Sequence, residues 1–203
     1  MQLLPFLAVA FVVVITPGVD MALVTKNALV HGRRQALATA FGINAGIAVW
    51  TVDAALGVAA AVQASAAAFA VIKFAGALYL VYLGAQALRN ARRAPAQAHA
   101  LRSGSAQGGA FHQGLVSNLL NPKIAVFFTS LLPQFVSHGT LPELLVLGAL
   151  FNAMGVIWLA SYALLASRGR VFLHRPRVKC VLDYVSGIIL VGLGVRLALE
   201  RRG

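Results

Sequence analysis

Apolar residues fill six long stretches of the chain, at about 3–24, 38–62, 66–88, 114–136, 142–166 and 181–199. A helix needs roughly 20 mostly apolar residues to cross a bilayer, and each stretch comes close to that length or exceeds it. The pattern therefore predicts an all-α integral membrane protein with six transmembrane helices. We expect these helices to form one membrane domain over residues 1–203.

The first apolar stretch contains residues that an uninterrupted membrane helix should lack, namely Thr16-Pro17-Gly18 and, two positions later, Asp20. Proline removes a backbone donor and clashes with the preceding turn, and glycine adds conformational freedom, so the helix should break here. Asp20 would lie where the second half-helix begins. One interpretation is a proline kink with a capping aspartate, and the other is a functional acid at membrane depth.

The fourth stretch contains a similar interruption at Asn121-Pro122-Lys123, preceded by Asn118. If the helix breaks here, its freed N–H groups and Lys123 would form a pocket that favours an anion such as a carboxylate. Alternatively, Lys123 points into the cytoplasm from near the helix end. Either way, the first and fourth helices are predicted to be broken helices.

The two halves of the chain resemble each other at spaced polar and aromatic positions. Asn44 matches Asn152, and Trp50 matches Trp158 six residues later in both halves. Three helices per half place the second copy in the membrane upside down, so we predict two inverted repeats. This is a common plan of secondary transporters, with the binding site between paired broken helices. The predicted parts are a first repeat, a basic flexible loop and a second repeat, at residues 1–88, 89–112 and 113–203.

Composition and charge support a membrane location. The chain is 60% hydrophobic with a mean hydropathy of +0.82, and its net charge is +12. Of its 17 Lys and Arg residues, twelve lie in the links after the first, third and fifth stretches. The positive-inside rule places these links in the cytoplasm and both termini outside. The basic links suit anionic lipid, and they lack the interleaved aromatics that favour nucleic acid.

Few polar side chains fall within the predicted spans, so each is a candidate for function. Asp53 lies halfway through the second span, where a carboxylate needs a partner, a raised pKa or a water-filled cavity. It would exchange a proton or hold an ammonium group, or else be a buried acid bonded to a hydroxyl such as that of Thr51. Asn44 and Asn152 either bind substrate or join helices by hydrogen bonds.

Lys73 in the third span matches Asp183 in the sixth span when the two halves are compared. We interpret the two as a structural ion pair, although the long stem of Lys73 also allows it to reach the membrane surface.

The five histidines fall in or beside the links and show no ligand spacing, so we assign no metal site and expect no cofactor. The sequence lacks phosphate-binding loops and hydrolase motifs, which argues against an enzyme.

Taken together and in this order, several motifs resemble the LysE/RhtB family of bacterial amino-acid exporters over nearly the whole chain. They are Thr16-Pro17-Gly18-Val19-Asp20, His31 to Leu37, Phe41-Gly42-Ile43, Lys73 to Gly84, Asn118 to Lys123 and Leu132-Pro133-Gln134-Phe135. The resemblance implies proton-linked or potential-driven efflux across the bacterial inner membrane. Asp53 is similar to an acid of the lysine and arginine exporters. Their second acid, however, is replaced here by Phe127, which leaves cationic and neutral substrates open.

The resulting hypothesis is an exporter that works by alternating access around a site near the membrane midplane. Lys123, Asn121 and the freed N–H groups would receive the substrate carboxylate, and Asp53 and Asp20 would face its ammonium group or exchange a proton. A homo-oligomer is compatible with this hypothesis. The alternatives are an exporter of another small solute, such as a metal cation or a thiol compound, a membrane scaffold subunit, and an intramembrane enzyme.

Replacing Asp53 by Asn is predicted to abolish transport while the folded protein stays in the membrane, because an amide cannot carry the proton. Efflux from preloaded cells, with the amount of protein in the membrane measured alongside, checks this. Normal efflux by the variant would remove Asp53 from the mechanism.

Overall fold

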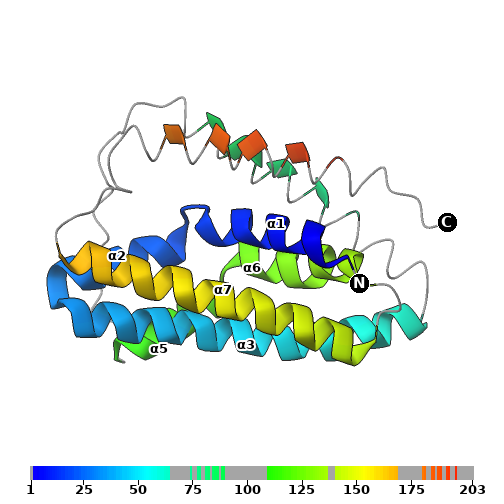
Figure 1. Ribbon diagram of the computed structural model, residues 1–203, viewed down its shortest axis with the longest axis horizontal. Helices are drawn as coiled ribbons and strands as arrows, with labels where there is room; N and C mark the ends of the chain where they lie inside the picture. Colours follow the sequence, from blue (N-terminus) through cyan, green and yellow to red (C-terminus); the bar gives the residue numbers. More distant parts are fainter. Residues whose placement is uncertain are drawn as a thin grey trace.

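The computed structural model describes residues 2–64, 109–136 and 140–168, together with scattered residues within 74–89 and 180–195. Every regular element in these parts is helical (Figure 1). In chain order they are α1 Leu3–Ile15, α2 Val19–His31, α3 Arg33–Ala64, α5 Ala110–Leu119, α6 Pro122–Val126, a π-helix Phe127–Leu131, a 3-10 helix Leu132–Phe135 and α7 Leu141–Ser167.

Four of the six predicted spans can be compared with this structure. Helices α3 and α7 are each long and apolar enough to cross a membrane unbroken. Two bent pairs of helices pass the same test of length and composition together: α1 and α2 meet at 47°, and α5 and the segment Pro122–Phe135 meet at 49°. The predicted third and sixth spans, with the Lys73–Asp183 pair, lie outside the described residues apart from scattered positions. The structure thus agrees with an all-helical membrane protein.

The first bend occurs at the predicted place, and proline is its cause. Thr16 takes an extended backbone conformation, as expected of a residue that precedes proline, and Gly18 is extended as well. Helix α2 then begins at Val19, so that Asp20 lies in its first turn. The hydroxyl of Thr16 donates a 2.6 Å hydrogen bond to the Val12 carbonyl, which also accepts the backbone N–H of Thr16. Thr16 therefore ends α1.

The connection between the first and second spans is shorter than predicted. Instead of a loop over about 25–37, α2 continues to His31 and α3 begins at Arg33. Gly32 alone makes the turn, with φ of +80° and an extended ψ, a conformation that only glycine adopts readily. Arg33 and Arg34 consequently lie on a helix. A similar correction applies to the predicted 89–112 loop, because α5 already begins at Ala110.

Asn121 and Pro122 produce the second bend. The Asn121 side-chain oxygen accepts a 3.1 Å hydrogen bond from the Lys123 backbone N–H, which makes Asn121 the N-cap of α6. Pro122 occupies the first helical position, where its missing donor costs nothing. Beyond α6 the backbone widens into the π-helix and then tightens into the 3-10 helix, and this irregularity was not predicted from the sequence.

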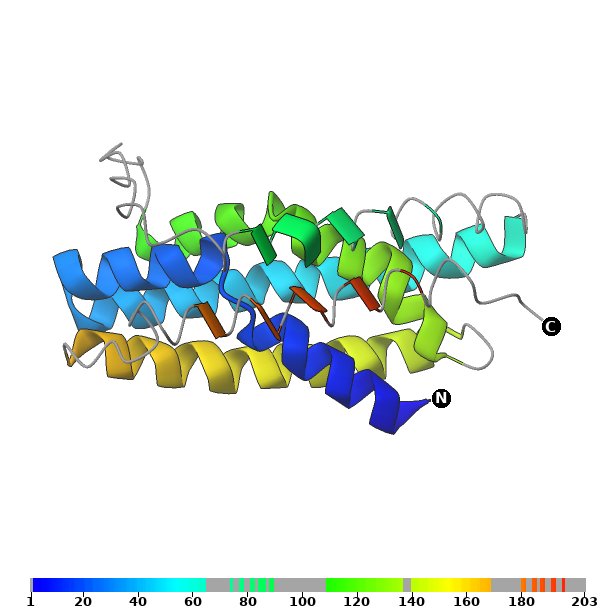
Figure 2. The same cartoon turned by 90° about the horizontal axis from the view of Figure 1, so that it is seen from above.

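Helix α3 lies between α5 and α7 and contacts both (Figure 2). Glycines allow this close approach: a methyl group at Gly42 would overlap the Phe111 carbonyl, and one at Gly114 would overlap the Thr39 carbonyl. On the other side, Gly148 packs against Thr51 and Gly155 against Asn44, so α3 and α7 run antiparallel. Small residues at helix contacts are the usual way for membrane helices to pack tightly.

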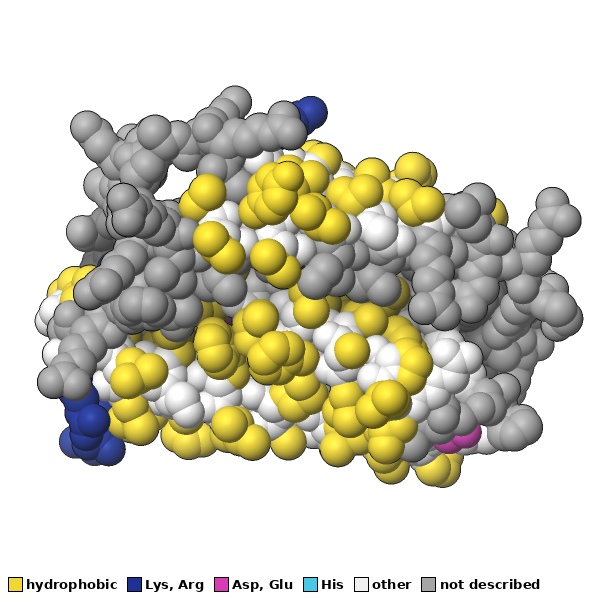
Figure 3. Space-filling model, turned by 45° about the horizontal axis from the view of Figure 1, so that its top comes forward, with side chains coloured by type: hydrophobic (Ala, Val, Ile, Leu, Met, Phe, Trp, Pro, Cys, Tyr) yellow, Lys and Arg dark blue, Asp and Glu magenta, His cyan; other side chains and the backbone are white. Residues whose placement is uncertain are grey.

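Basic residues gather at one end of this bundle (Figure 3). Arg33 and Arg34 follow the Gly32 turn there, and Arg168 ends α7 at the same end. The start of α1 lies at the opposite end, where the Gln2 N–H donates a 2.8 Å hydrogen bond to the Phe135 carbonyl. The charge is therefore asymmetric along the bundle axis in the described part of the chain.

Substituting Ala for Gly42 should destabilise the protein, because the added methyl group forces α5 away from α3. Overpacking of this kind costs about 1–3 kcal/mol, or roughly 2–4 °C of melting temperature per kcal/mol in a chain of this size. Gly57→Ala on the same helix is the matched control, since its methyl group meets open space. Equal melting temperatures of the two purified variants would contradict the packing described here.

Candidate functional site

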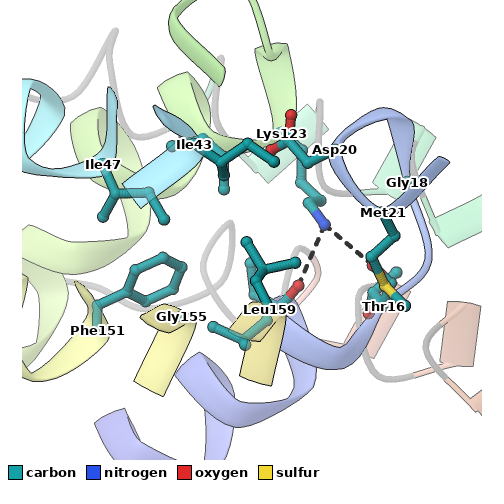
Figure 4. Close-up of a pocket in the computed structure, with 13 residues that line it drawn as sticks. Thr16, Gly18, Asp20, Met21, Ile43, Ile47, Lys123, Phe151, Gly155 and Leu159 are labelled. Carbon is teal, nitrogen blue, oxygen red and sulfur yellow. Dashed lines mark hydrogen bonds between the residues drawn. The ribbon is translucent and has the colours of Figure 1, made fainter. Parts of the chain in front are cut away.

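The ammonium group of Lys123 reaches from the second bend to the first. Its Nζ donates hydrogen bonds of 3.2 Å to the carbonyls of Val13 and Thr16 (Figure 4). In an unbroken helix the Val13 carbonyl would accept the N–H of residue 17, but Pro17 has none. Lys123 thus supplies the donor that the proline removed. Of the two orientations considered for Lys123, the structure has the one that points into the protein.

Asp20 makes the reverse connection, from the first bend to the second. Its carboxylate accepts hydrogen bonds from the Ser117 hydroxyl at 2.8 Å, from Asn118 Nδ2 at 3.0 Å and from Asn121 Nδ2 at 2.9 Å. Asn118 is fully buried, and Asp20 itself is half-buried. Asp20 does not cap α2 with its side chain. Each bend is therefore held by a charged side chain that the other bend provides.

A small cavity lies beside these two side chains. Its volume is about 30 Å³, well below the roughly 150 Å³ of a cavity that admits benzene, so this conformation has no room for an amino acid. Asp20, Lys123 and the Thr16–Gly18 link form its polar side. The opposite wall is apolar (Figure 4) and consists of Ile43, Ile47, Phe151, Gly155 and Leu159.

Asn44 is buried and Asn152 is half-buried, and neither side chain lines the cavity. Asn44 Nδ2 donates a 2.8 Å hydrogen bond to the Ala40 carbonyl of its own helix. The side-chain oxygens of Asn44 and Asn152 have no partner within the described part of the chain. The matched tryptophans differ, because Trp50 donates a 3.4 Å hydrogen bond to the Asn118 carbonyl, whereas the buried Nε1 of Trp158 has no partner among the described residues.

The structure places Asp53 away from the cavity. It is exposed on α3, among the exposed side chains of Val49, Val52 and Leu56. Thr51 does not bond to it, since the Thr51 hydroxyl donates to the Ile47 carbonyl at 2.9 Å. Phe127, at the place of the second acid of lysine exporters, is buried against Phe151 with ring centroids 4.4 Å apart. The acid beside the cavity is Asp20.

Helix α2 is tied to its neighbours on the side of the cavity nearer the basic end. The hydroxyls of Thr25 and Tyr162 share a 2.7 Å hydrogen bond, which joins α2 to α7. Asn27 Nδ2 donates to the Thr39 hydroxyl at 2.7 Å and thereby joins α2 to α3. These buried bonds close the bundle between the cavity and the Gly32 turn.

Most of the predicted residues come together around the two bends, but the sequence analysis missed some contacts. Thr16, Gly18, Asp20 and Lys123 line the cavity, while Asn118 and Asn121 lie behind Asp20. Ser117 was missed, although it directly precedes Asn118. The described residues contain no group of three His, Cys, Asp or Glu side chains that would hold a metal ion.

Comparison with known proteins gives one family and several relatives. The family described as LysE type translocator matches residues 11–201. The threonine efflux protein of Escherichia coli K12 is 31% identical, with 98% of this chain and 100% of that protein aligned. The homoserine/homoserine lactone efflux protein of Salmonella typhimurium LT2 is 30% identical over 92% of this chain and 91% of that protein.

An uncharacterized membrane protein of Bacillus subtilis 168 is 31% identical, with 98% of this chain and 99% of that protein aligned. No solved structure matches this chain. The sequence relatives are therefore the basis of comparison.

Lys123→Met should destabilise the protein by about 1–3 kcal/mol, because it leaves the Val13 and Thr16 carbonyls without a donor. In the double variant Pro17→Ala, Lys123→Met, residue 17 regains an N–H for the Val13 carbonyl. The double variant should therefore lose less stability than the two single variants lose together, as expected of residues that share a partner.

Melting temperatures of the four purified chains measure this coupling. Lys26→Met, which removes an equal charge from α2, is the control and should leave the coupling unchanged. Strictly additive losses would show that Lys123 does not replace the donor missing at Pro17.

Proposed function

The chain belongs to the LysE type translocator family, and on that premise we propose that it exports a small neutral amino acid across the bacterial inner membrane. Family membership makes it a membrane transporter rather than an enzyme. The observation that carries the proposal is a cavity between two broken helices with an ammonium group on one side and an apolar wall opposite. Once widened by a movement of the helices, such a cavity would suit the carboxylate and the hydrocarbon part of an amino acid.

Lys123 is the proposed carboxylate receptor. A lysine ammonium has three N–H donors, and two of them bond to the Val13 and Thr16 carbonyls. The third is available to a substrate carboxylate, and a charge-assisted bond to it would be stronger than a neutral one. Lys123 would then bind the substrate while still bracing the first bend.

A neutral substrate is favoured over a cationic one for two reasons. The carboxylate of Asp20 already accepts three hydrogen bonds, so little of its capacity remains for a second cation. In addition, Phe127 puts an aromatic ring where lysine exporters carry an acid. The relatives named as threonine and homoserine efflux proteins agree with this choice.

Asp20 is the proposed proton carrier. Once protonated, it would accept fewer hydrogen bonds and would no longer offset the charge of Lys123. The bonds from Asn118 and Asn121 would weaken, and the second bend would be released from the first. Proton binding and helix movement would thereby be coupled through one carboxylate.

Alternating access would rock one half of the bundle against the other around the cavity. Two observations support this arrangement: the two bends have similar angles of 47° and 49°, and α3 and α7 pack antiparallel, as inverted copies would. Opening toward the basic end would require α2 to give up the Thr25–Tyr162 and Asn27–Thr39 bonds. We assign this end to the cytoplasm, where anionic lipid would attract the basic residues, and the N-terminus to the periplasm.

Export of another small solute, such as a metal cation or a thiol compound, and a scaffold role stay as alternatives. A metal cation needs a cluster of ligands, which the described residues do not form. A scaffold would not need an acid and a lysine that brace two broken helices beside a cavity.

We expect cells that carry this chain to export L-threonine and L-homoserine faster than control cells, and L-lysine no faster. Collapse of the proton gradient should remove the difference. Asp20→Asn should lower the export rate at least about 10²-fold, the lower end of the usual 10²–10⁴-fold range of proton-transfer groups, because an amide cannot take up the proton. Asp20→Glu should keep part of the activity.

Asp53→Asn in the same assay distinguishes two versions of the site. Because Asp53 is exposed and outside the cavity, we expect the variant's export rate to stay within about twofold of that of the unaltered chain, as for most surface substitutions. Export lost in Asp53→Asn but kept in Asp20→Asn would move the site to the outer side of α3. Selective export of lysine would overturn the neutral substrate.

A further inference from the structure

Two buried amide oxygens on α3 and α7 have no hydrogen-bond donor among the residues that the structure describes. Within the described part of the chain, the side-chain oxygens of Asn44 and Asn152 are among the four buried polar side-chain atoms that lack a partner. Asn44 is 95% buried, with a relative exposure of 5%. Leaving such an acceptor unpaired is unfavourable, so its retention calls for an explanation.

Both amides lie at the contact between α3 and α7. A Cβ atom added at Gly155 would lie 2.7 Å from the Asn44 oxygen, and Gly155 lines the cavity. Asn152 lies between Gly148, which faces Thr51, and Gly155, which faces Asn44. Since the helices run antiparallel, Asn152 is opposite the part of α3 between Asn44 and Thr51. The two residues are therefore offset by about one helical turn, or roughly 5.4 Å, along the helix axes.

The cavity wall is continuous with this contact. Ile43 and Ile47, which are close to Asn44 on α3, line the cavity, and so does Phe151, which directly precedes Asn152 on α7. Figure 4 places Ile47, Phe151 and Gly155 across the cavity from Lys123. The Asn44 oxygen therefore lies directly behind Gly155, a residue of the cavity lining that is across from the Lys123 ammonium group.

The Asn44 amide has a defined orientation. Its Nδ2 group bonds to the Ala40 carbonyl within α3, which leaves the oxygen as the free end of the side chain. An asparagine that only joined helices would use this oxygen across the contact, and Asn44 does not. Gly155 carries no side chain that would cover it.

We propose that the side-chain oxygens of Asn44 and Asn152 bind the α-ammonium group of the substrate, while its carboxylate binds Lys123. This inference rests on the proposed export of amino acids. Uncharged amide oxygens accept N–H bonds without attracting a second cationic group, which matches a zwitterion with a neutral side chain. Gly155 is the proposed specificity residue, because it keeps the Asn44 oxygen accessible once the cavity widens.

Isothermal titration of the purified full-length protein tests the assignment with two ligands. One is L-threonine, and the other is 2,3-dihydroxybutanoate, in which a hydroxyl replaces the ammonium group. Asn44→Leu, of similar shape, should weaken threonine binding about ten- to hundredfold, the usual worth of a hydrogen bond to a charged group. Binding of the hydroxy acid should change less than about threefold.

Three further variants keep the test decisive. Asn44→Asp retains a side-chain oxygen and should bind threonine more tightly than Asn44→Leu. Asn152→Leu should lose threonine binding to the same extent as Asn44→Leu. Gly155→Ala covers the Asn44 oxygen, so it should weaken threonine binding even if Asn44→Leu fails to fold. Gly57→Ala on α3 is the matched control and should behave as the unaltered chain.

Equal losses for both ligands, or undiminished threonine binding in the Leu variants, would overturn the ammonium subsite and leave the exporter proposal standing. Failure of the unaltered protein to bind threonine, homoserine or the hydroxy acid would instead overturn the proposed function, and the subsite with it. A loss confined to the ammonium-bearing ligand would support both.

Discussion

The missing N–H of Pro17 is the constraint on which the rest of the site depends. A backbone carbonyl in a membrane needs a donor, because lipid tails offer none. The Val13 carbonyl finds this donor in Lys123, a residue 110 positions away along the chain. The two broken helices must therefore lie side by side, and a charged ammonium group must enter the bundle between them.

That ammonium group in turn explains Asp20. An ammonium group inside a bundle is costly unless an opposite charge accompanies it, and the Asp20 carboxylate, which lines the same cavity, supplies that charge while accepting bonds from Asn118 and Asn121. The cavity lies beside this crossed pair of contacts. A site built in this way can change shape when one charge is altered, which is what coupling of transport to a proton requires.

Close packing around α3 holds this arrangement in place. Gly42 and Gly114 let the backbones of α3 and α5 come into contact, and Gly148 and Gly155 let α7 pack against the Thr51 and Asn44 side chains of α3. The second bend and the apolar wall are thus attached to the same helix. Within this packing the Asn44 oxygen has no donor from the described part of the chain, and we propose a ligand as its partner.

The sequence by itself determined the helical class, the two breaks and most of the polar residues around them, because hydropathy, proline and charge act locally. It misplaced the loop at Gly32, since the length of a helix depends on the packing of its ends. Only the tertiary structure decided that Asp20 rather than Asp53 lies at the cavity, that Ser117 joins it, and that Lys123 points inward. Those contacts join residues about 100 positions apart, and no local pattern specifies which distant side chain meets which.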